Sequence, residues 1–451
     1  DEPPPNHAKT ESQPQSVGQP ARTCLAASGR MDNPAQAAIF ADMKTDADIL
    51  IVGGGLNGPA LALALAQGGF RVVVIDARPA PKRAEAGFDG RAYALAIASK
   101  RLLSMIGVWP VVAEKVQPIL KIKASDGLPG QGPAPFFLAF DHAEIEEGPM
   151  GFMLEDRHLY AAFLAAMQAT PGLTLMSGET VVSQEITAHG AMVTLASGKI
   201  LTGQVLIGCD GRGSGTATRA GIARTGWGYG QTAIVTAIGH EKHHQGSAQQ
   251  FFMPAGPLAI LPLAGGHVSS IVWSESAAAA AAIQALPDDL FLQALRPRFG
   301  DFLGKIALAG ARFSYPLSLS LANSFVAPRL ALVGDAAHGV HPIAGQGLNL
   351  GLRDVGALAQ VLIEARRRGE DIGAADVLER YQRWRRFDAT TLALGMDAVN
   401  RLFSNDNPIL RLGRDLGLGV VNAIPGLRRR MIRQAAGLNG DLPRLLAGQQ
   451  I

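Results

Sequence analysis

The stretch ADILIVGGGLNGPALALALAQGGFRVVVID, residues 47–76, decides the fold. It reads as an apolar strand, a glycine-rich turn, a helix rich in alanine and leucine, and a second apolar strand that ends on Asp76. The turn matches G-x-G-x-x-G at Gly53, Gly55 and Gly58, and an acidic residue about twenty positions later completes a dinucleotide-binding pattern. The chain is therefore predicted to bind a cofactor with an ADP half, which leaves NAD and FAD open.

Each residue of this turn has an expected role. Gly53 permits the tight turn, Gly55 lets a pyrophosphate approach the backbone, and Gly58 lets helix and strand pack closely. The helix N-terminus offers N–H groups and a partial positive charge to the phosphates. Asp76 would accept hydrogen bonds from the adenosine ribose. The alternative is an ordinary strand–helix turn that binds no phosphate.

Two further apolar strands end in the same manner. GQVLIGCDGRGSG, residues 203–215, ends its strand on Asp210 and Gly211, and SFVAPRLALVGDAAHGVHPIAGQGLNLGLRD, residues 324–354, ends its strand on Gly334 and Asp335. Open α/β sheets bind ligands at the carboxyl ends of their strands. Three such ends favour FAD, a cofactor long enough to lie across the sheet, over a nicotinamide nucleotide.

Length and composition set the limits. At 451 residues the chain is long enough for two or more domains, or one discontinuous pair. A net charge of +3, without basic groups interleaved with aromatics, indicates no nucleic-acid partner. Cys24 and Cys209 are too few for a disulfide framework and too far apart to indicate a metal site, so we expect no metal and a reducing cytoplasmic setting. Residues 1–43, rich in Pro, Ser and Gln, are predicted to be a disordered extension.

The three strand ends resemble the GxGxxG, DG and GD motifs of the flavoprotein aromatic monooxygenases. HPIAGQGLNLGLRD, residues 341–354, resembles the signature of the ubiquinone-biosynthesis branch of that family. The resemblance covers nearly everything from Lys44 onward, including FMLEDRHLYAAFLAAM, residues 152–167, and GDLPRLL, residues 440–446. One departure lies in the DG motif, where Ala217 stands in place of the usual arginine and Arg219 follows two residues later.

The resemblance implies an α/β fold with three parts. We expect a Rossmann-like FAD-binding domain of the aromatic-hydroxylase type, a discontinuous substrate domain with a mainly antiparallel sheet, and a helical C-terminal tail. The FAD-binding domain would comprise residues 44–120, 151–222 and 321–395. The substrate domain would comprise residues 121–150 and 223–320, and the helical region residues 396–451.

The resemblance also implies how the flavin is held. Asp335 would bind the ribityl chain, and Leu348 and Asn349 would offer N–H groups to the pyrimidine edge. The flavin ring would lie against Pro342, Gly345 and Gly347, with no acid or base residue assigned. His338 and His341 are interpreted as turn histidines that order the loop. The complete predicted set of cofactor-binding residues is Gly53, Gly55, Gly58, Asp76, Arg91, Asp156, Asp210, Gly211, Gly334, Asp335, Gly345, Gln346, Gly347, Leu348 and Asn349.

The activity implied is hydroxylation of the aromatic ring of a polyprenylated phenol in ubiquinone biosynthesis. The family uses FAD, NADH or NADPH, and O2, by way of a flavin C4a-hydroperoxide that must be kept from water. Two alternatives stay open: a flavin-dependent reductase or dehydrogenase acting on an isoprenoid, and a non-catalytic FAD-binding member of the biosynthetic assembly.

Residues 223–320 contain alternating apolar patterns, which predict strands of a sheet with one face covering the flavin. Apolar residues of these strands either line a substrate pocket or form the ordinary core of the sheet; the candidates are Phe252, Leu258, Ile260 and Trp273. His243 and His244 are predicted to lie in a solvated loop.

The tail carries an apolar stripe with helical spacing, interrupted by Pro425 and followed by four arginines. Such a segment would lie on an anionic membrane surface or on partner proteins of ubiquinone biosynthesis, making the protein peripheral on the inner face of the membrane. The alternative is that the stripe packs on the flavin domain and the arginines are merely solvated. The stripe is Leu412, Leu416, Val420, Ile424, Leu427 and Met431, and the arginines are Arg428, Arg429, Arg430 and Arg433.

Overall fold

The computed structural model of the chain describes residues 45–80, 91–130, 132–404 and 408–451. The extension predicted for residues 1–43 lies outside the described residues. Lys44–Ile451 form one compact unit, and the domain boundaries given above stay a prediction within it.

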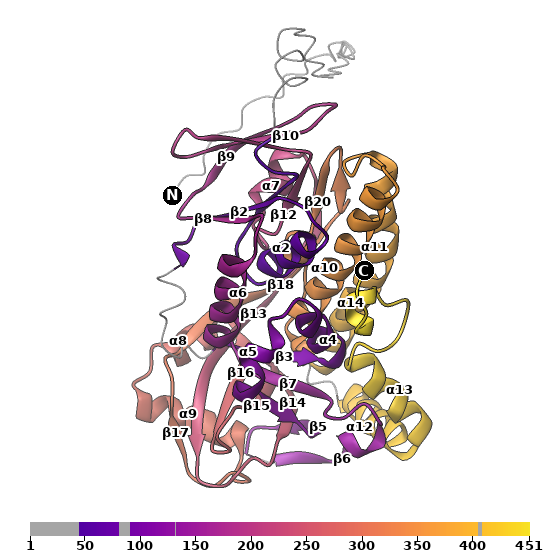
Figure 1. Ribbon diagram of the computed structural model, residues 1–451. Coiled ribbons are helices and arrows are strands. Elements are labelled where there is room, and N and C mark those ends of the chain that lie inside the picture. Colours follow the sequence, from indigo (N-terminus) through magenta and orange to yellow (C-terminus); the bar gives the residue numbers. More distant parts are fainter. Residues whose placement is uncertain (1–44, 81–90, 131, 405–407) are drawn as a thin grey trace, which may run out of the picture. The chain divides into compact units, whose positions relative to one another are not determined.

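A six-stranded sheet carries the three predicted turns (Figure 1). Five of its strands are parallel, and only the edge strand β19 runs antiparallel. The strand order is β19 (Val326–Ala327), β20 (Leu330–Leu332), β12 (Val205–Gly208), β1 (Ile49–Val52), β2 (Val72–Asp76) and β8 (Leu173–Ser177). Because β20, β12 and β1 are parallel neighbours, the turns that follow them meet at one edge of the sheet, as predicted.

Helices pack on this sheet because its strands are apolar on both faces. The strands β1 and β12 are fully buried, as is typical of parallel strands covered on two sides. The helix α2 buries eight of its eleven residues, nearly all Ala or Leu. The helices around the sheet are α2 (Asn57–Gln67), α6 (Asp156–Ala169), α7 (Gly215–Arg219), α10 (Gln346–Arg367) and α11 (Ala375–Phe403).

A second, nine-stranded sheet is mainly antiparallel, which confirms the predicted type of the sheet. Only the pair β14 and β5 is parallel. The order is β21 (His338–Gly339), β18 (Phe313–Ala322), β13 (Arg224–His240), β16 (Val268–Ser276), β15 (Gly256–Pro262), β14 (Ser247–Met253), β5 (Lys121–Leu128) and β6 (Gly132–Asp141), with β17 (Ile306–Leu308) also paired to β13. Two helices, α8 (Ala277–Gln284) and α9 (Asp288–Phe299), contribute to the apolar cluster on one face.

Two three-stranded sheets complete the β structure. One consists of β3 (Ala92–Ala96), β7 (Gly151–Glu155) and β4 (Gln117–Ile119), and the short helices α4 (Ile97–Met105) and α5 (Trp109–Val112) follow β3 in the chain. The other consists of β11 (Ile200–Gly203), β10 (Ala191–Leu195) and β9 (Val181–Ile186).

The C-terminal region is helical, as predicted, with α12 (Pro408–Ala423), α13 (Pro425–Ala435) and α14 (Arg444–Ala447). Part of it belongs to the hydrophobic core, since Ile432 and Leu446 are buried. A buried ion pair also joins α12 to β5, with Arg414 Nη2 2.6 Å from Asp126 Oδ2. Among the helices within the described residues, none combines the length and apolar character needed to cross a bilayer.

Candidate cofactor site

The strand ends of the six-stranded sheet border a cavity of about 490 Å³. It brings together six of the predicted cofactor residues from all three turns: Gly53, Gly55, Asp76, Asp210, Gly211 and Asp335. Arg78, Glu179 and Arg219 also line it, so the arginine that follows the altered position of the DG motif is present at the site. A cavity that joins the dinucleotide turn to both acidic turns fits the elongated FAD.

The glycines of the first turn differ in what surrounds them. Gly53 has a φ of +110°, and a Cβ there would lie 2.3 Å from the Cys209 carbonyl oxygen. A Cβ on Gly58 would lie 2.0 Å from the Gly53 carbonyl oxygen. A Cβ on Gly55 would meet no described atom within 4 Å, and this residue lines the cavity. Gly53 and Gly58 therefore shape the turn, whereas Gly55 keeps its surface open to a ligand.

The two aspartates at the ends of β2 and β12 differ in what their carboxylates already bind. Asp76 accepts the backbone N–H of Arg78 at 2.7 Å and lies where the adenosine ribose is expected. Asp210 accepts the Ser214 hydroxyl at 2.5 Å and both the N–H and the hydroxyl of Thr216 at 2.9 Å. Asp210 therefore holds the start of α7, a role that its position after the strand did not predict.

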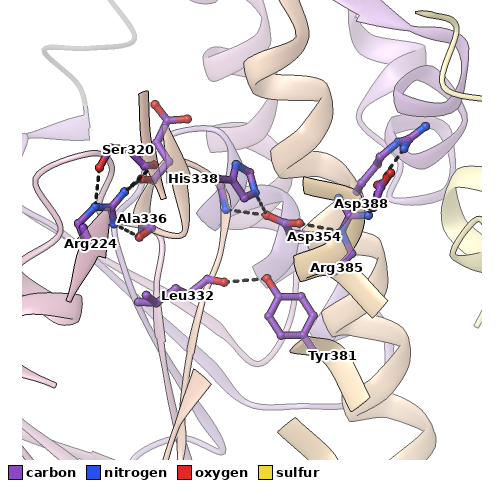
Figure 2. Close-up of polar contacts among 12 residues, drawn as sticks. Arg224, Ser320, Leu332, Ala336, His338, Asp354, Tyr381, Arg385 and Asp388 are labelled. Carbon is purple, nitrogen blue, oxygen red and sulfur yellow. Dashed lines mark hydrogen bonds and ion pairs between the residues drawn. The ribbon is translucent and has the colours of Figure 1, made fainter. Parts of the chain in front are cut away.

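Arg212 joins the second turn to the third. Its Nε donates to Asp335 Oδ2 at 3.1 Å, and its Nη2 donates to the Val340 carbonyl at 2.7 Å. Arg224 donates to the carbonyl oxygens of Asp335 and Ala336 (Figure 2). Sequence reasoning missed both arginines, although Arg212 stands inside a glycine-rich turn where a long cationic side chain is unusual.

A buried charge network fixes the third turn to the helices behind it (Figure 2). The Asp354 carboxylate is inaccessible to solvent and accepts the Gly334 N–H at 3.0 Å, the Arg385 Nε at 2.8 Å and a hydrogen bond from His338. Although burial acts to raise it, His338 and Arg385 hold the pKa of Asp354 below its ordinary value. His338 thus orders the loop as expected, and Gly334 is placed by a side chain that the motif analysis did not single out.

The loop and the start of α10 are fixed by a second buried side chain. Asn349 Oδ1 accepts the Ala96 N–H at 2.8 Å and the Ser99 hydroxyl at 2.7 Å, and its Nδ2 donates to the Ala94 carbonyl at 2.8 Å. Gly345 precedes the helix in the left-handed region with a φ of +62°. The side chain of Asn349 therefore holds α10 against β3 and α4, while its predicted N–H contact to the flavin stays a prediction.

The structure places the remaining predicted residues in two groups. Pro342, Gln346, Gly347 and Leu348 are partly exposed around the start of α10, and a Cβ on Gly347 would meet no described atom within 4 Å. Arg91 and Asp156 lie together away from the cavity lining, with Arg91 Nη2 3.3 Å from Asp156 Oδ2. The Tyr93 hydroxyl donates to the same Asp156 carboxylate at 2.9 Å. Flavin contacts of these residues stay a prediction.

Three of the four predicted pocket residues belong instead to the sheet's core. Leu258, Ile260 and Trp273 are buried in the apolar cluster that includes Phe291 of α9. Phe252 is different, since its ring lies 4.3 Å from the ring of Phe403 on α11. The alternation of the strands was predicted, but it could not tell which face the helix α9 covers. Leu258, Ile260 and Trp273 therefore form sheet core, whereas a substrate contact of Phe252 stays a prediction.

The histidine loop was predicted incorrectly in part. His243 is exposed, but His244 is buried, and its Nε2 lies 2.8 Å from the Leu263 carbonyl oxygen. Across the part of the chain that the structure describes, no group of three or more His, Cys, Asp or Glu side chains is placed to hold a metal ion.

A dinucleotide turn and two acidic turns around one cavity, beside a mainly antiparallel second sheet, are the features expected of an FAD-dependent flavoprotein monooxygenase. The family model described as "FAD binding domain" matches residues 46–393. Ubiquinone hydroxylase UbiL of Rhodospirillum rubrum is 45% identical over 405 residues, covering 89% of this chain and 93% of that protein. The 3-demethoxyubiquinol 3-hydroxylase of Escherichia coli is 37% identical over 393 residues, covering 87% of this chain and 98% of that protein. The chain belongs to this family of FAD-binding hydroxylases.

A solved structure supports the same fold. The p-nitrophenol 4-monooxygenase PnpA from Pseudomonas putida superposes with a TM-score of 0.74 over 88% of this chain and 99% of that chain, at 18% identity. At that identity the likeness concerns the fold alone.

Proposed function

We propose that this enzyme hydroxylates the aromatic ring of a polyprenylated phenol in ubiquinone biosynthesis, using NADH or NADPH and O2. The observation that carries the proposal is the 45% identity to ubiquinone hydroxylase UbiL along nearly the whole of both chains. The geometry is compatible with it, since residues 341–354, a loop and the start of α10, follow the third turn of the cavity.

The chain's own residues hold and orient the cofactor, which supplies the redox chemistry and the activation of oxygen when bound. Gly55 and the N-terminus of α2 would receive the pyrophosphate, and Asp76 the adenosine ribose. Asp335 would bind the ribityl chain. The N-terminus of α10 carries the partial positive charge of a helix start, which would stabilise negative charge on the pyrimidine edge of the ring.

Exclusion of water decides whether oxygen reaches the product. With a 2-polyprenylphenol as substrate, we expect NAD(P)H oxidation to yield one hydroxylated product for each NAD(P)H. With a poor analogue such as the corresponding methyl ether, we expect oxygen to leave as hydrogen peroxide instead. Product is measured by mass spectrometry, and peroxide by a peroxidase-coupled assay.

The same assay separates the alternatives. NAD(P)H oxidation that yields neither hydroxylated product nor peroxide would favour the reductase or dehydrogenase. A holoprotein that retains FAD but never oxidises NAD(P)H with any prenylated phenol would favour the non-catalytic assembly member.

We further propose that the C-terminal helices rest on an anionic lipid surface. Val420, Ile424, Leu427 and Met431 are 57%, 47%, 39% and 39% exposed, so this part of the predicted stripe does not pack on the flavin domain. The structure does not describe the side chains of Leu412 and Leu416, the other two residues of the stripe. A row of exposed large apolar side chains on consecutive helices is typical of an interaction surface.

The arginines of α13 divide into two kinds. Arg428 and Arg433 pair with Glu144 and Glu147 at 2.6 and 2.5 Å and therefore fix α13 to the protein. Arg429 and Arg430 are exposed beside the apolar row. An exposed arginine near an anionic bilayer adds about 1 kcal/mol of attraction. A polyprenylated substrate is concentrated in membranes, which makes lipid the fitting partner for this surface.

A double substitution tests this surface. Val420→Ser with Ile424→Ser should reduce binding to phosphatidylglycerol-containing vesicles about tenfold, because apolar burial contributes about 25 cal/mol for each Å². Vesicle sedimentation measures the binding, and flavin absorbance checks that FAD is retained.

The matched control is Val182→Ser with Ile200→Ser, since these residues are 56% and 52% exposed on the small sheet of β9–β11. Equal vesicle binding by both double variants would point to a partner protein or to no partner at this surface. Truncation before Leu412 would not separate membrane binding from folding, because it would also remove the buried side chains of Arg414, Ile432 and Leu446.

A further inference from the structure

The side chain of His341 is buried, and its polar atoms lack hydrogen-bond partners in the described part of the chain. It lies in the loop between β21 and the 3-10 turn Ile343–Gly345, and only 1% of its surface is exposed. Neither ring nitrogen has a hydrogen-bond partner among the described residues. Buried polar groups in proteins nearly always have a partner. The loop-ordering role expected for both histidines therefore belongs to His338, and His341 needs another explanation.

The surroundings of His341 include side chains from two separate elements. The ring of Tyr229, on β13, meets its ring edge-to-face with 5.2 Å between centroids. Asp397, on α11, accepts the Trp227 Nε1–H and the Arg401 Nε–H, each at 2.9 Å. The hydroxyl of Tyr229 is also buried and makes no hydrogen bond of good geometry within the described part of the chain.

Burial and a nearby positive charge keep the His341 imidazole neutral. Burial, then the nearby Arg212 guanidinium, lower the pKa of His341 to about 4, and the Asp397 carboxylate only partly opposes them. Burial, then Asp397, raise the pKa of Tyr229, so this phenol also stays neutral. A neutral imidazole presents one N–H donor and one lone-pair acceptor. At physiological pH His341 therefore offers a free acceptor nitrogen.

We propose that His341 recognises the ring hydroxyl of the substrate, which donates a hydrogen bond to the lone-pair nitrogen of the neutral imidazole. The residue that follows, Pro342, is the one predicted to line the flavin ring, so the contact would place the phenol beside the flavin. Tyr229 holds the imidazole by its edge-to-face contact. The inference rests on the proposed function, because it assigns a contact to the phenolic substrate.

The test compares the binding of two ligands to the wild type and to variants of His341. The ligands are 2-geranylphenol and its O-methyl ether, which differ in the hydroxyl hydrogen that His341 would bind. Binding is measured on the oxidised holoenzyme, without NAD(P)H, from the change in flavin absorbance. We expect the wild type to prefer the phenol about tenfold, as for a typical net hydrogen bond, and His341→Leu to show no preference. His341→Gln, which keeps an acceptor, should recover part of the preference.

The matched control is His243→Leu, which removes an exposed histidine from the turn before β14 and should keep the wild-type preference. FAD content and thermal unfolding establish that each variant is folded. The preference should also stay constant from pH 8 down to pH 5.5, because the pKa of His341 lies at about 4. An ordinary histidine would protonate in this range and lose its acceptor.

A tenfold preference that survives in a folded His341→Leu protein would overturn the inference, as would a preference that disappears between pH 7 and 6. If the wild type and His341→Leu both hydroxylate the phenol and show the same preference for it over the methyl ether, only the role of His341 is rejected. If the wild-type holoenzyme neither binds nor hydroxylates the phenol, the proposed function is rejected together with it.

Discussion

Replacement of Asp354 by asparagine should lower the free energy of unfolding by about 3–5 kcal/mol and release FAD, because it removes the fully buried one of the two carboxylates that compensate the buried Arg385 guanidinium. Asp354 is fully buried and binds Arg385, His338 and the Gly334 N–H at once. The same change loosens the turn that carries Asp335, so the flavin site and the core are lost together. Urea unfolding and the flavin absorbance of the gel-filtered protein measure the two effects.

The matched control is Asp388→Asn, because Asp388 also pairs with Arg385, at 2.5 Å, but its side chain is 37% exposed. Because the Asp388 end of this pair is partly solvated and Asp354 still compensates Arg385, this variant should lose less stability than Asp354→Asn and should keep its FAD. Similar losses in the two variants would contradict the role given to burial.

The pH dependence of stability has a definite sign for Asp354. Its pKa is lowered in the folded protein, so its contribution is present above the unfolded value of about 3.9 and is lost as the pH falls through the folded pKa. Between pH 5 and pH 3 the wild type should therefore lose more stability than Asp354→Asn.

Two neighbouring glycines should separate cofactor binding from folding. Gly55→Val adds a side chain that meets no described atom within 4 Å and points into the cavity lining, so the protein should fold but be colourless. Gly58→Val adds a Cβ 2.0 Å from the Gly53 carbonyl oxygen, a backbone atom that cannot move aside, so this variant should not fold. Circular dichroism, thermal unfolding and FAD titration distinguish the two outcomes.

Gly395→Val is the control, since this exposed glycine on α11 also has no described atom within 4 Å of its added Cβ. It should bind FAD as the wild type does. A yellow Gly55→Val protein with a full complement of FAD would mean that the first turn has been misread.

The fold could be predicted because its signals are local. The strands β1, β12 and β20 are short apolar runs, as is typical of parallel strands buried on both faces. β1 ends at the glycines of the first turn, and β12 and β20 are each followed within three residues by an aspartate next to a glycine. The three turns could therefore be placed at one sheet edge, and FAD inferred, without any long-range contact.

The side chains that hold the site together could not be predicted because their partners are distant in the chain. Asn349 binds the N–H of Ala96, 253 positions away, and Arg212 binds Asp335, 123 positions away. Nothing in the motif around Asp354 indicates that Arg385 will lie against it. The sequence likewise presents His341 as one more loop histidine, whereas in the structure neither of its ring nitrogens has a hydrogen-bond partner among the described residues.

The strand order has a consequence for how the chain is made. During synthesis β1 and β2 emerge early, but the second neighbour of β1 in the sheet is β12, which is made much later. The second neighbour of β12 is β20, near residue 330. For most of translation a fully apolar strand edge has no neighbour, which is the condition under which nascent chains aggregate. Since Asp335 also lines the cavity, the complete lining exists only after residue 335 has been made. Chaperone supply during synthesis, rather than cofactor supply, should therefore limit the yield of the holoenzyme.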